Sequence, residues 1–424
     1  MSDLSGRDRQ YVWHPFTPQL GAEPNIPLVR GKDALLIDAD GNEYIDAIAS
    51  WWVNLHGHCH PYITQKIKEQ LDKLEHAIFS GYTHEPAVVL AEKLLEKLPH
   101  CSKVFYSDDG STSVEVALKM AFQYWHNKGE QRTKVIAFEN AYHGDTFGSM
   151  SVGARNVFSN AFSSFLFDVV HIPVPVAGKK AESIAVLKSH LDKNTAVFIY
   201  EPLVQGAAGM IMYEAAPLDE MIALCKQAGV ITIADEVMTG FGRTGTLFAS
   251  NQCAHQPDII CLSKGLTGGF MPLGATLCTQ EIYSAYLTSD RTKTFFHGHS
   301  YTANPLACAA AVASLEWFEK GNVMSTVEQL AQFMKSAAEQ FRNHAAVADA
   351  RSKGAILAVE LKSAEETGYL NPTGEKVSAF FYKRGVIMRP LGNVIYFIPP
   401  YCITREQLQH VVNSMLQFAA SLAT

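Results

Sequence analysis

The sequence predicts an α/β fold in which a large domain, built on a mostly parallel sheet, is joined to a smaller α+β domain. Short runs rich in β-branched residues alternate with helix-forming stretches through the middle of the chain. Beyond that region, long helical patterns mix with short strands, and a hairpin pattern lies near the N-terminus. Alternation of this kind is typical of a parallel sheet that is covered by helices on both faces.

The composition is that of a globular protein of roughly two or three domains. Of the 424 residues, 47% are hydrophobic and 18% are charged, and the net charge of −7 argues against the basic surface that nucleic-acid binding needs. The eight cysteines include no C-x-x-C pair, so no disulfide framework or zinc site is predicted, and a cytoplasmic location is expected. We expect neither a secretory signal nor a membrane span, because no run approaches ~18 apolar residues.

The large domain is predicted from strands that alternate with helical patterns. The helical patterns include 113–125 and 218–228. The predicted strands are 103–106, 134–138, 196–200, 230–234, 259–262 and 274–278.

The two ends of the chain are predicted to form the rest of the structure. A hairpin is expected near the N-terminus, with strands 34–38 and 43–46 joined at Asp40-Gly41-Asn42. In the C-terminal part we expect helices at 305–320, 326–345 and 374–384 and strands at 355–361, 386–388 and 394–397. We therefore divide the chain into an N-terminal segment (1–55) that packs with the small domain, a large domain (56–314) and a small C-terminal domain (315–424).

A candidate phosphate site follows the predicted strand 103–106. Gly110 permits close approach of the backbone, and Ser111 supplies a hydroxyl at the start of a helical pattern. The alternative is an ordinary helix cap, which would be the better interpretation if this stretch stood alone. The neighbouring Asp108 and Asp109 argue against a heavily charged polyphosphate.

Two charged side chains follow two other predicted strands. Asp235 comes directly after 230–234, and Lys264 follows 259–262. Ligands bind beyond the carboxyl ends of strands in such sheets, and a desolvated lysine there becomes a nucleophilic amine. A lysine that forms an imine and a carboxylate that binds a pyridine nitrogen are what pyridoxal phosphate (PLP) needs. The pair alone is equally consistent with a structural salt bridge, but together with the phosphate site it indicates PLP.

Three further motifs allow more than one interpretation. Tyr142, after strand 134–138, suits the face of a planar cofactor, although an aromatic at this place also suits core packing. Residues 240–245 match G-x-G-x-x-G, but they do not follow their strand directly and open no helix, so nicotinamide binding is disfavoured. Histidines at 56, 58 and 60 are better explained by a turn than by a metal site, and no metal is expected. Residues 297–300 are interpreted as a loop that offers polar groups to a ligand.

The motifs at 234–237, 240–245 and 263–265 resemble those of the class III (ω-type) aminotransferases of PLP fold type I, and the resemblance runs nearly end to end. It implies a mostly parallel seven-stranded sheet and a homodimer with active sites at the subunit interface. It also implies that Lys264 forms the imine with PLP and moves the proton, that Asp235 pairs with the pyridine nitrogen and that Tyr142 stacks on the ring. The implied phosphate-binding residues are Gly110, Ser111, His299 and Ser300, with Ser300 reaching the neighbouring subunit's cofactor.

Within the class, several motifs resemble the branch that converts 8-amino-7-oxononanoate to 7,8-diaminononanoate in biotin synthesis, with S-adenosylmethionine as amino donor. They include Trp13-His14-Pro15, Ser50-Trp51-Trp52 and residues 396–401. The substrate-binding residues that this resemblance implies are Phe16, Trp51, Trp52, Tyr142, Gly298, Arg389 and Tyr396. Phe16 stands where the family commonly has tyrosine, so it can stack on an adenine ring but cannot make the hydroxyl's hydrogen bond.

Four alternatives to this assignment stay open at this point. The same acceptor can be served by lysine as donor, or the chain can be another ω-aminotransferase. From other classes, one alternative is a nicotinamide-dependent oxidoreductase, for which residues 240–245 are the only support. The other is a catalytically inactive binding protein with the PLP fold, which an intact Lys264 and Asp235 argue against.

Overall fold

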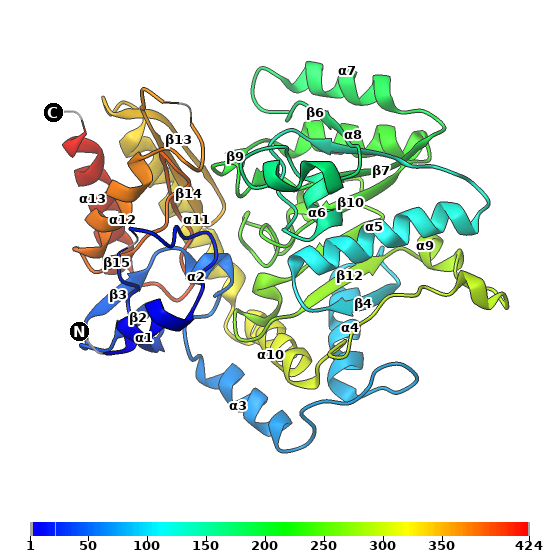
Figure 1. Ribbon diagram of the computed structural model, residues 1–424, viewed down its shortest axis with the longest axis horizontal. Helices are drawn as coiled ribbons and strands as arrows, with labels where there is room; N and C mark the ends of the chain where they lie inside the picture. Colours follow the sequence, from blue (N-terminus) through cyan, green and yellow to red (C-terminus); the bar gives the residue numbers. More distant parts are fainter. Residues whose placement is uncertain (1–2, 22, 366, 423–424) are drawn as a thin grey trace.

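The computed structural model describes residues 3–21, 23–365 and 367–422, and its centre is a seven-stranded sheet (Figure 1). The strands lie in the order β4 (Lys103–Ser107), β12 (Gly274–Cys278), β11 (Ile259–Leu262), β10 (Ile231–Asp235), β7 (Thr195–Tyr200), β5 (Lys134–Phe138) and β6 (Val170–Ile172). Strand β12 runs antiparallel to both of its neighbours, whereas the other adjacent pairs are parallel. The predicted mostly parallel sheet is therefore confirmed.

Helices cover both faces of this sheet. Helix α5 (Gly110–Asn127) crosses one face and contacts β4, β7, β10, β11 and β12. Helix α8 (Ala215–Gln227) packs on β10 from the other face, next to α7 (Lys180–His190). Strands β7, β10, β11 and β12 are buried at every position, which explains their continuous apolar sequences.

The N-terminal strands share a second sheet with a strand from the far end of the chain. Its order is β1 (Leu28–Lys32), β2 (Leu35–Asp38), β3 (Glu43–Asp46) and β15 (Val386–Ile387). Strands β2 and β3 form the expected hairpin, in which Gly41 has a φ of +86°, and β15 runs parallel to β3. Figure 1 shows the blue N-terminal segment beside the orange C-terminal elements. The domain boundaries at 55 and 314 stay predictions.

The C-terminal part combines helices with an antiparallel three-stranded sheet, β13 (Val347–Lys353), β14 (Ile356–Leu361) and β16 (Val394–Phe397). Its helices are α10 (Pro305–Lys320), α11 (Val323–Phe341), α12 (Thr373–Tyr382) and α13 (Arg405–Ser421). The remaining α-helices and strands are α1 (Asp3–Tyr11), α2 (Ala49–Trp52), α3 (Pro61–Leu71), α4 (Glu85–Lys97), α6 (Phe147–Val152), β8 (Val204–Gln205), β9 (Ile211–Met212) and α9 (Gln280–Ser284). Among the described residues, no helix has the length and apolar character that a membrane crossing requires.

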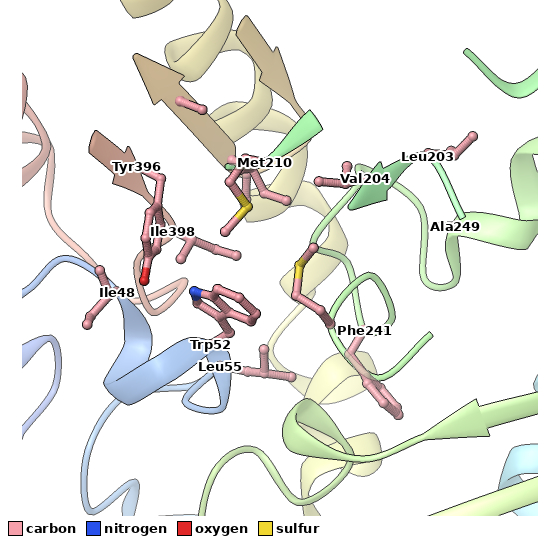
Figure 2. Close-up of a cluster of buried hydrophobic side chains, with 14 of the residues drawn as sticks. Ile48, Trp52, Leu55, Leu203, Val204, Met210, Phe241, Ala249, Tyr396 and Ile398 are labelled. Carbon is pink, nitrogen blue, oxygen red and sulfur yellow. The ribbon is translucent and has the colours of Figure 1, made fainter. Parts of the chain in front are cut away.

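The N-terminal segment, the central sheet and the C-terminal part meet in one apolar cluster (Figure 2). Trp52 from α2 lies at its centre, and the ring of Tyr396 from β16 packs edge-on against it, with centroids 5.9 Å apart. Met210 and Phe241 approach from loops of the large domain, and all four side chains are at most 4% exposed. This cluster fixes α2 beside the ends of the central strands.

Candidate active site

The carboxyl ends of the central strands open into one cavity of about 700 Å³. The residues that line it follow different strands: Asp235 ends β10, Lys264 follows β11, Glu201 follows β7 and Gly110 follows β4. Because parallel strands end at the same edge of a sheet, side chains far apart in sequence converge there. The structure thus brings the predicted lysine, carboxylate and glycine together.

Lys264 lies in this cavity with its Nζ 4.6 Å from the centroid of the Trp52 ring. Its φ of +45° places it in the left-handed region, which is unfavourable for a residue with a side chain. Burial lowers the pKa of Lys264 to about 8, although the carboxylates of Asp235 and Glu201 oppose the shift. The amine is therefore neutral far more often near neutral pH than an exposed lysine, which is what a nucleophile requires.

Asp235 is 5% exposed, and two donors hold its carboxylate. The Nδ1 of His143 lies 2.7 Å from Oδ2, and the Val237 N–H donates to Oδ1 at 3.0 Å. An ionised carboxylate only accepts hydrogen bonds, so the hydrogen of His143 is assigned to Nδ1. The Nε2 of His143 has no hydrogen-bond partner among the residues that the structure describes.

Glu201 adds a second carboxyl group to the cavity. Its Oε1 accepts from the Tyr142 N–H at 3.1 Å and its Oε2 from the Gly206 N–H at 2.9 Å. Burial is the main cause that raises the pKa of Glu201 to about 7, and the nearby Asp235 adds to the rise. Near neutral pH this group therefore exists in both protonation states.

The N-terminus of α5 forms the rim of the cavity. Asp109 caps the helix by accepting from the Thr112 N–H at 2.8 Å, and the phosphate-binding role of Gly110 and Ser111 stays a prediction. A Cβ added to Gly110 would lie 2.5 Å from Val237 Cγ1, which explains the glycine. The hydroxyl of Ser111 lies 2.8 Å from Thr146 Oγ1, and Glu115 accepts from Thr146 Oγ1 at 2.6 Å. These bonds tie the loop that carries Tyr142 to α5.

Two of the predicted substrate residues, Phe16 and Arg389, lie against a third, Trp51. The ring of Trp51 packs edge-on against Phe16 with centroids 5.4 Å apart, and the Arg389 guanidinium carbon lies 4.7 Å from the Trp51 centroid. Arg389 donates from Nη2 to the Tyr369 hydroxyl at 2.8 Å. Tyr142 lines the main cavity, and its hydroxyl donates to Asp145 at 2.9 Å. Phe16 lines a neighbouring cavity of about 410 Å³.

Four predicted site residues lie elsewhere. Tyr396 is 0% exposed behind Trp52, which itself lines the cavity. Gly298 and Ser300 are exposed and do not line this chain's cavity, and His299 approaches its rim through Asp108, with Nδ1 3.4 Å from a carboxylate oxygen. Their predicted roles stay predictions.

Residues 240–245 form turns in which Arg243 is buried. Its guanidinium donates to the carbonyl oxygens of Pro399 at 2.7 Å and Asn54 at 2.9 Å, so this loop joins the N-terminal segment to the C-terminal part. Among the histidines at 56–60, His56 contacts Ser314 Oγ through Nε2 at 3.0 Å, and His58 contacts Asp46 through Nε2 at 2.8 Å. Over the part of the chain that the structure describes, no group of three metal-ligating side chains is present.

Comparison with known proteins agrees with this arrangement. The family model described as aminotransferase class-III matches residues 19–418. The chain is 48% identical over 411 residues to the adenosylmethionine-8-amino-7-oxononanoate aminotransferase of Synechococcus elongatus, which covers 95% of this chain and 96% of the relative.

Solved structures superpose along almost the whole chain. The adenosylmethionine-8-amino-7-oxononanoate aminotransferase of Methanocaldococcus jannaschii has a TM-score of 0.94 at 38% identity, over 99% of this chain and 98% of the other. An amine transaminase from an uncultivated Pseudomonas species, in its PLP-bound (internal aldimine) form, has a TM-score of 0.91 at 31% identity. The match covers 97% of this chain and 98% of the other. These superpositions confirm the predicted type I fold of PLP-dependent transferases. Because the family model and the relatives span nearly its full length, this chain belongs to the class III aminotransferase family.

Proposed function

We propose that the protein is a PLP-dependent aminotransferase that converts 8-amino-7-oxononanoate to 7,8-diaminononanoate in biotin synthesis, with S-adenosylmethionine as the amino donor. The observation that carries the proposal is the convergence of Lys264, Asp235 and Gly110 in one cavity of a class III aminotransferase. The names of the relatives from Synechococcus elongatus and Methanocaldococcus jannaschii supply the two substrates.

The residues of the cavity fit PLP. A lysine whose pKa is lowered to about 8 offers a neutral amine, and the buried carboxylate of Asp235 offers a partner for a protonated pyridine nitrogen. Gly110 and Ser111 at the start of α5 offer backbone N–H groups and a hydroxyl to a phosphate. The 700 Å³ cavity is large enough for the cofactor and the reacting part of a substrate.

When bound, PLP withdraws electrons from the carbon that bears the transferred nitrogen. Lys264, whose amine lies in the cavity, would hold the cofactor and would serve as the group that accepts and returns a proton. Asp235 would stabilise a protonated pyridine nitrogen, and His143 orients the Asp235 carboxylate through its 2.7 Å contact. Tyr142 and Trp52 line the cavity and would help to exclude water from the reacting groups.

The lowered pKa of Lys264 predicts the pH dependence of cofactor capture. Below about 8 the amine is mainly protonated and not nucleophilic, and above about 8 it is mainly neutral. The rate at which the cofactor-free protein captures PLP should therefore rise with pH and level off above about 8. Stopped-flow absorbance over pH 6–10 measures this rate. A capture rate that still rises tenfold per pH unit at pH 9 would contradict a lowered pKa of Lys264.

Arg389 should determine the affinity for the acceptor, whose carboxylate lies far from its ketone. A guanidinium beside Trp51 suits a carboxylate at the end of a long methylene chain. Arg389→Ala should raise KM for 8-amino-7-oxononanoate by about 10- to 150-fold, equivalent to ~1.5–3 kcal/mol. The donor half-reaction should change less, and single-turnover measurements separate the two. Arg384→Ala is the matched control, because the Arg384 guanidinium lies over the Phe380 ring and donates to the Phe380 carbonyl rather than lying beside Trp51. An unchanged acceptor KM would favour a general ω-aminotransferase.

The experiment that tests the proposed reaction is a panel of amino donors with 8-amino-7-oxononanoate as acceptor. S-adenosylmethionine should give 7,8-diaminononanoate, which mass spectrometry detects. Phe16 lacks the hydroxyl that the family commonly has at this position, so lysine and simple diamines belong in the panel. A protein that aminates only other ketones would be a different ω-aminotransferase.

The proposal includes a homodimer in the cytoplasm. Large apolar side chains are exposed around the 297–300 loop, among them Ile78, Tyr82, Phe296 and Tyr301. The ring of His76 lies 5.0 Å from that of Tyr301, so the segment before α4 and this loop form one surface. A second copy that covers it would hide these side chains and bring Ser300 toward the neighbouring cavity. Sedimentation of the holoenzyme tests this arrangement.

A further inference from the structure

Helix α2 is a left-handed turn made entirely of residues with side chains. Ala49, Ser50, Trp51 and Trp52 have φ values of 48°, 49°, 76° and 73°. Residues other than glycine normally adopt this conformation one at a time, because the Cβ atom approaches the following carbonyl oxygen. Four in succession need contacts that stabilise them, and such strain concentrates at functional sites.

One buried carboxylate provides these contacts. Asp46, which is 0% exposed, accepts from the Ser50 N–H at 3.0 Å through Oδ1 and from the Ser50 hydroxyl at 2.9 Å through Oδ2. The same Oδ1 accepts from the Ile48 N–H at 3.3 Å. Both carboxylate oxygens therefore hold the first half of the turn.

His58 orients this carboxylate. Its Nε2 lies 2.8 Å from Asp46 Oδ2, and its Nδ1 lies 3.3 Å from Asn54 Nδ2. The amide of Asn54 donates, so the hydrogen of the imidazole belongs on Nε2, and a neutral ring makes both contacts. The His58 N–H donates to the Asp33 carbonyl at 2.7 Å, which attaches it to the N-terminal sheet.

The turn places two tryptophans that face different parts of the site. Trp51 lies beside Arg389 and Phe16, at 4.7 Å and 5.4 Å, and Trp52 covers Lys264 at 4.6 Å. Neither Asp46 nor His58 lines the cavity. We propose that Asp46 and His58 are positioning residues that hold this turn left-handed and thereby place Trp51 against Arg389. The position of Trp51 then determines where the long-chain acceptor binds. This inference rests on the proposed function for the identity of that acceptor.

Two substitutions of His58 test the proposal as a matched pair. His58→Gln places an amide N–H close to the position of Nε2 and should leave KM for 8-amino-7-oxononanoate within about twofold of the wild type. His58→Leu removes the donor and should raise that KM by about 5- to 20-fold while kcat stays within about threefold. If His58→Leu fails to fold, Ser50→Ala removes one bond to Asp46 and should shift KM in the same direction. Equal effects of glutamine and leucine would overturn the role of the hydrogen bond.

A double substitution separates positioning from general destabilisation. If His58 acts through Trp51, the double variant Trp51→Ala/His58→Leu should have the same KM as Trp51→Ala alone. Once the Trp51 side chain is removed, the loss of His58 has nothing left to displace. Additive effects, or a lowered Tm with an unchanged KM, would overturn the proposal. Near-UV circular dichroism of the cofactor-free protein should change in His58→Leu and not in His58→Gln. This signal needs no substrate, so it still tests the turn if the wild type proves inactive with 8-amino-7-oxononanoate, which would be a failure of the proposed function alone.

Discussion

Replacing Lys264 by alanine should abolish multiple turnover, with a loss of at least about four orders of magnitude, or ~5.5 kcal/mol. Lys264 is the lysine that lines the cavity, and its proposed roles are to hold the cofactor and to transfer the proton. Steady-state assays measure the loss. Borohydride reduction of the wild-type holoenzyme should fix the cofactor on the peptide that contains Lys264, and the variant should show no such adduct.

Lys119→Ala provides the control for this substitution. Lys119 is a lysine outside the cavity, where its Nζ lies 3.0 Å from Nδ1 of His297. Its removal should leave the adduct on Lys264 and change turnover only slightly. Normal multiple turnover of Lys264→Ala would contradict the assignment of the cofactor lysine.

Asp235→Asn should reduce turnover by at least about two orders of magnitude, or ~2.7 kcal/mol. The asparagine keeps the shape of the side chain but removes the charge that stabilises a protonated pyridine nitrogen. It also retains only one of the two acceptors that His143 and the Val237 N–H now use. Rapid-quench measurement of each half-reaction should show that both are slowed, because both depend on the same ring nitrogen.

Glu236 offers a matched control for Asp235. It is adjacent in sequence and fully buried, but its carboxylate accepts from the Ala249 and Ser250 N–H groups rather than lining the cavity. Glu236→Gln should therefore lower Tm and leave the turnover of each folded molecule nearly unchanged. A near-normal rate for Asp235→Asn would mean that Asp235 is not the partner of the ring nitrogen.

Continuous burial made several strands of the large sheet predictable from the sequence. β5, β11 and β12 have the predicted bounds, because continuous apolar runs between polar residues mark strands that are covered on both faces. β6 escaped prediction because three residues are too few to show a periodicity. β15 falls within the strand predicted at 386–388, but its pairing with β3 joins distant parts of the chain, which a local pattern does not encode.

The site was predictable wherever a chemical group follows a strand. That rule located Asp235 and Lys264, and it applies equally to Glu201, which directly follows β7 and was missed. His143 lies in the motif around Tyr142, but its contact with Asp235 joins residues 92 positions apart. No sequence pattern indicated the left-handed turn at α2, since positive φ values are expected at glycine rather than at Ser50 or Trp51.

The contacts of the histidine motif also depended on tertiary structure. No acidic side chain lies within residues 56–60, so no local pattern indicates that His58 pairs with Asp46. The pairing arises because β3 ends at Asp46 and the chain returns to it after α2.

The most direct test of the proposed function is a single turnover of the acceptor half-reaction. The enzyme is first loaded with the amino group from S-adenosylmethionine, and the donor and its product are removed by gel filtration. Adding 8-amino-7-oxononanoate should then yield about one equivalent of 7,8-diaminononanoate per active site, as a ping-pong mechanism requires. No diaminononanoate from the loaded enzyme, together with rapid amination of an unrelated ketone, would contradict the assignment to biotin synthesis.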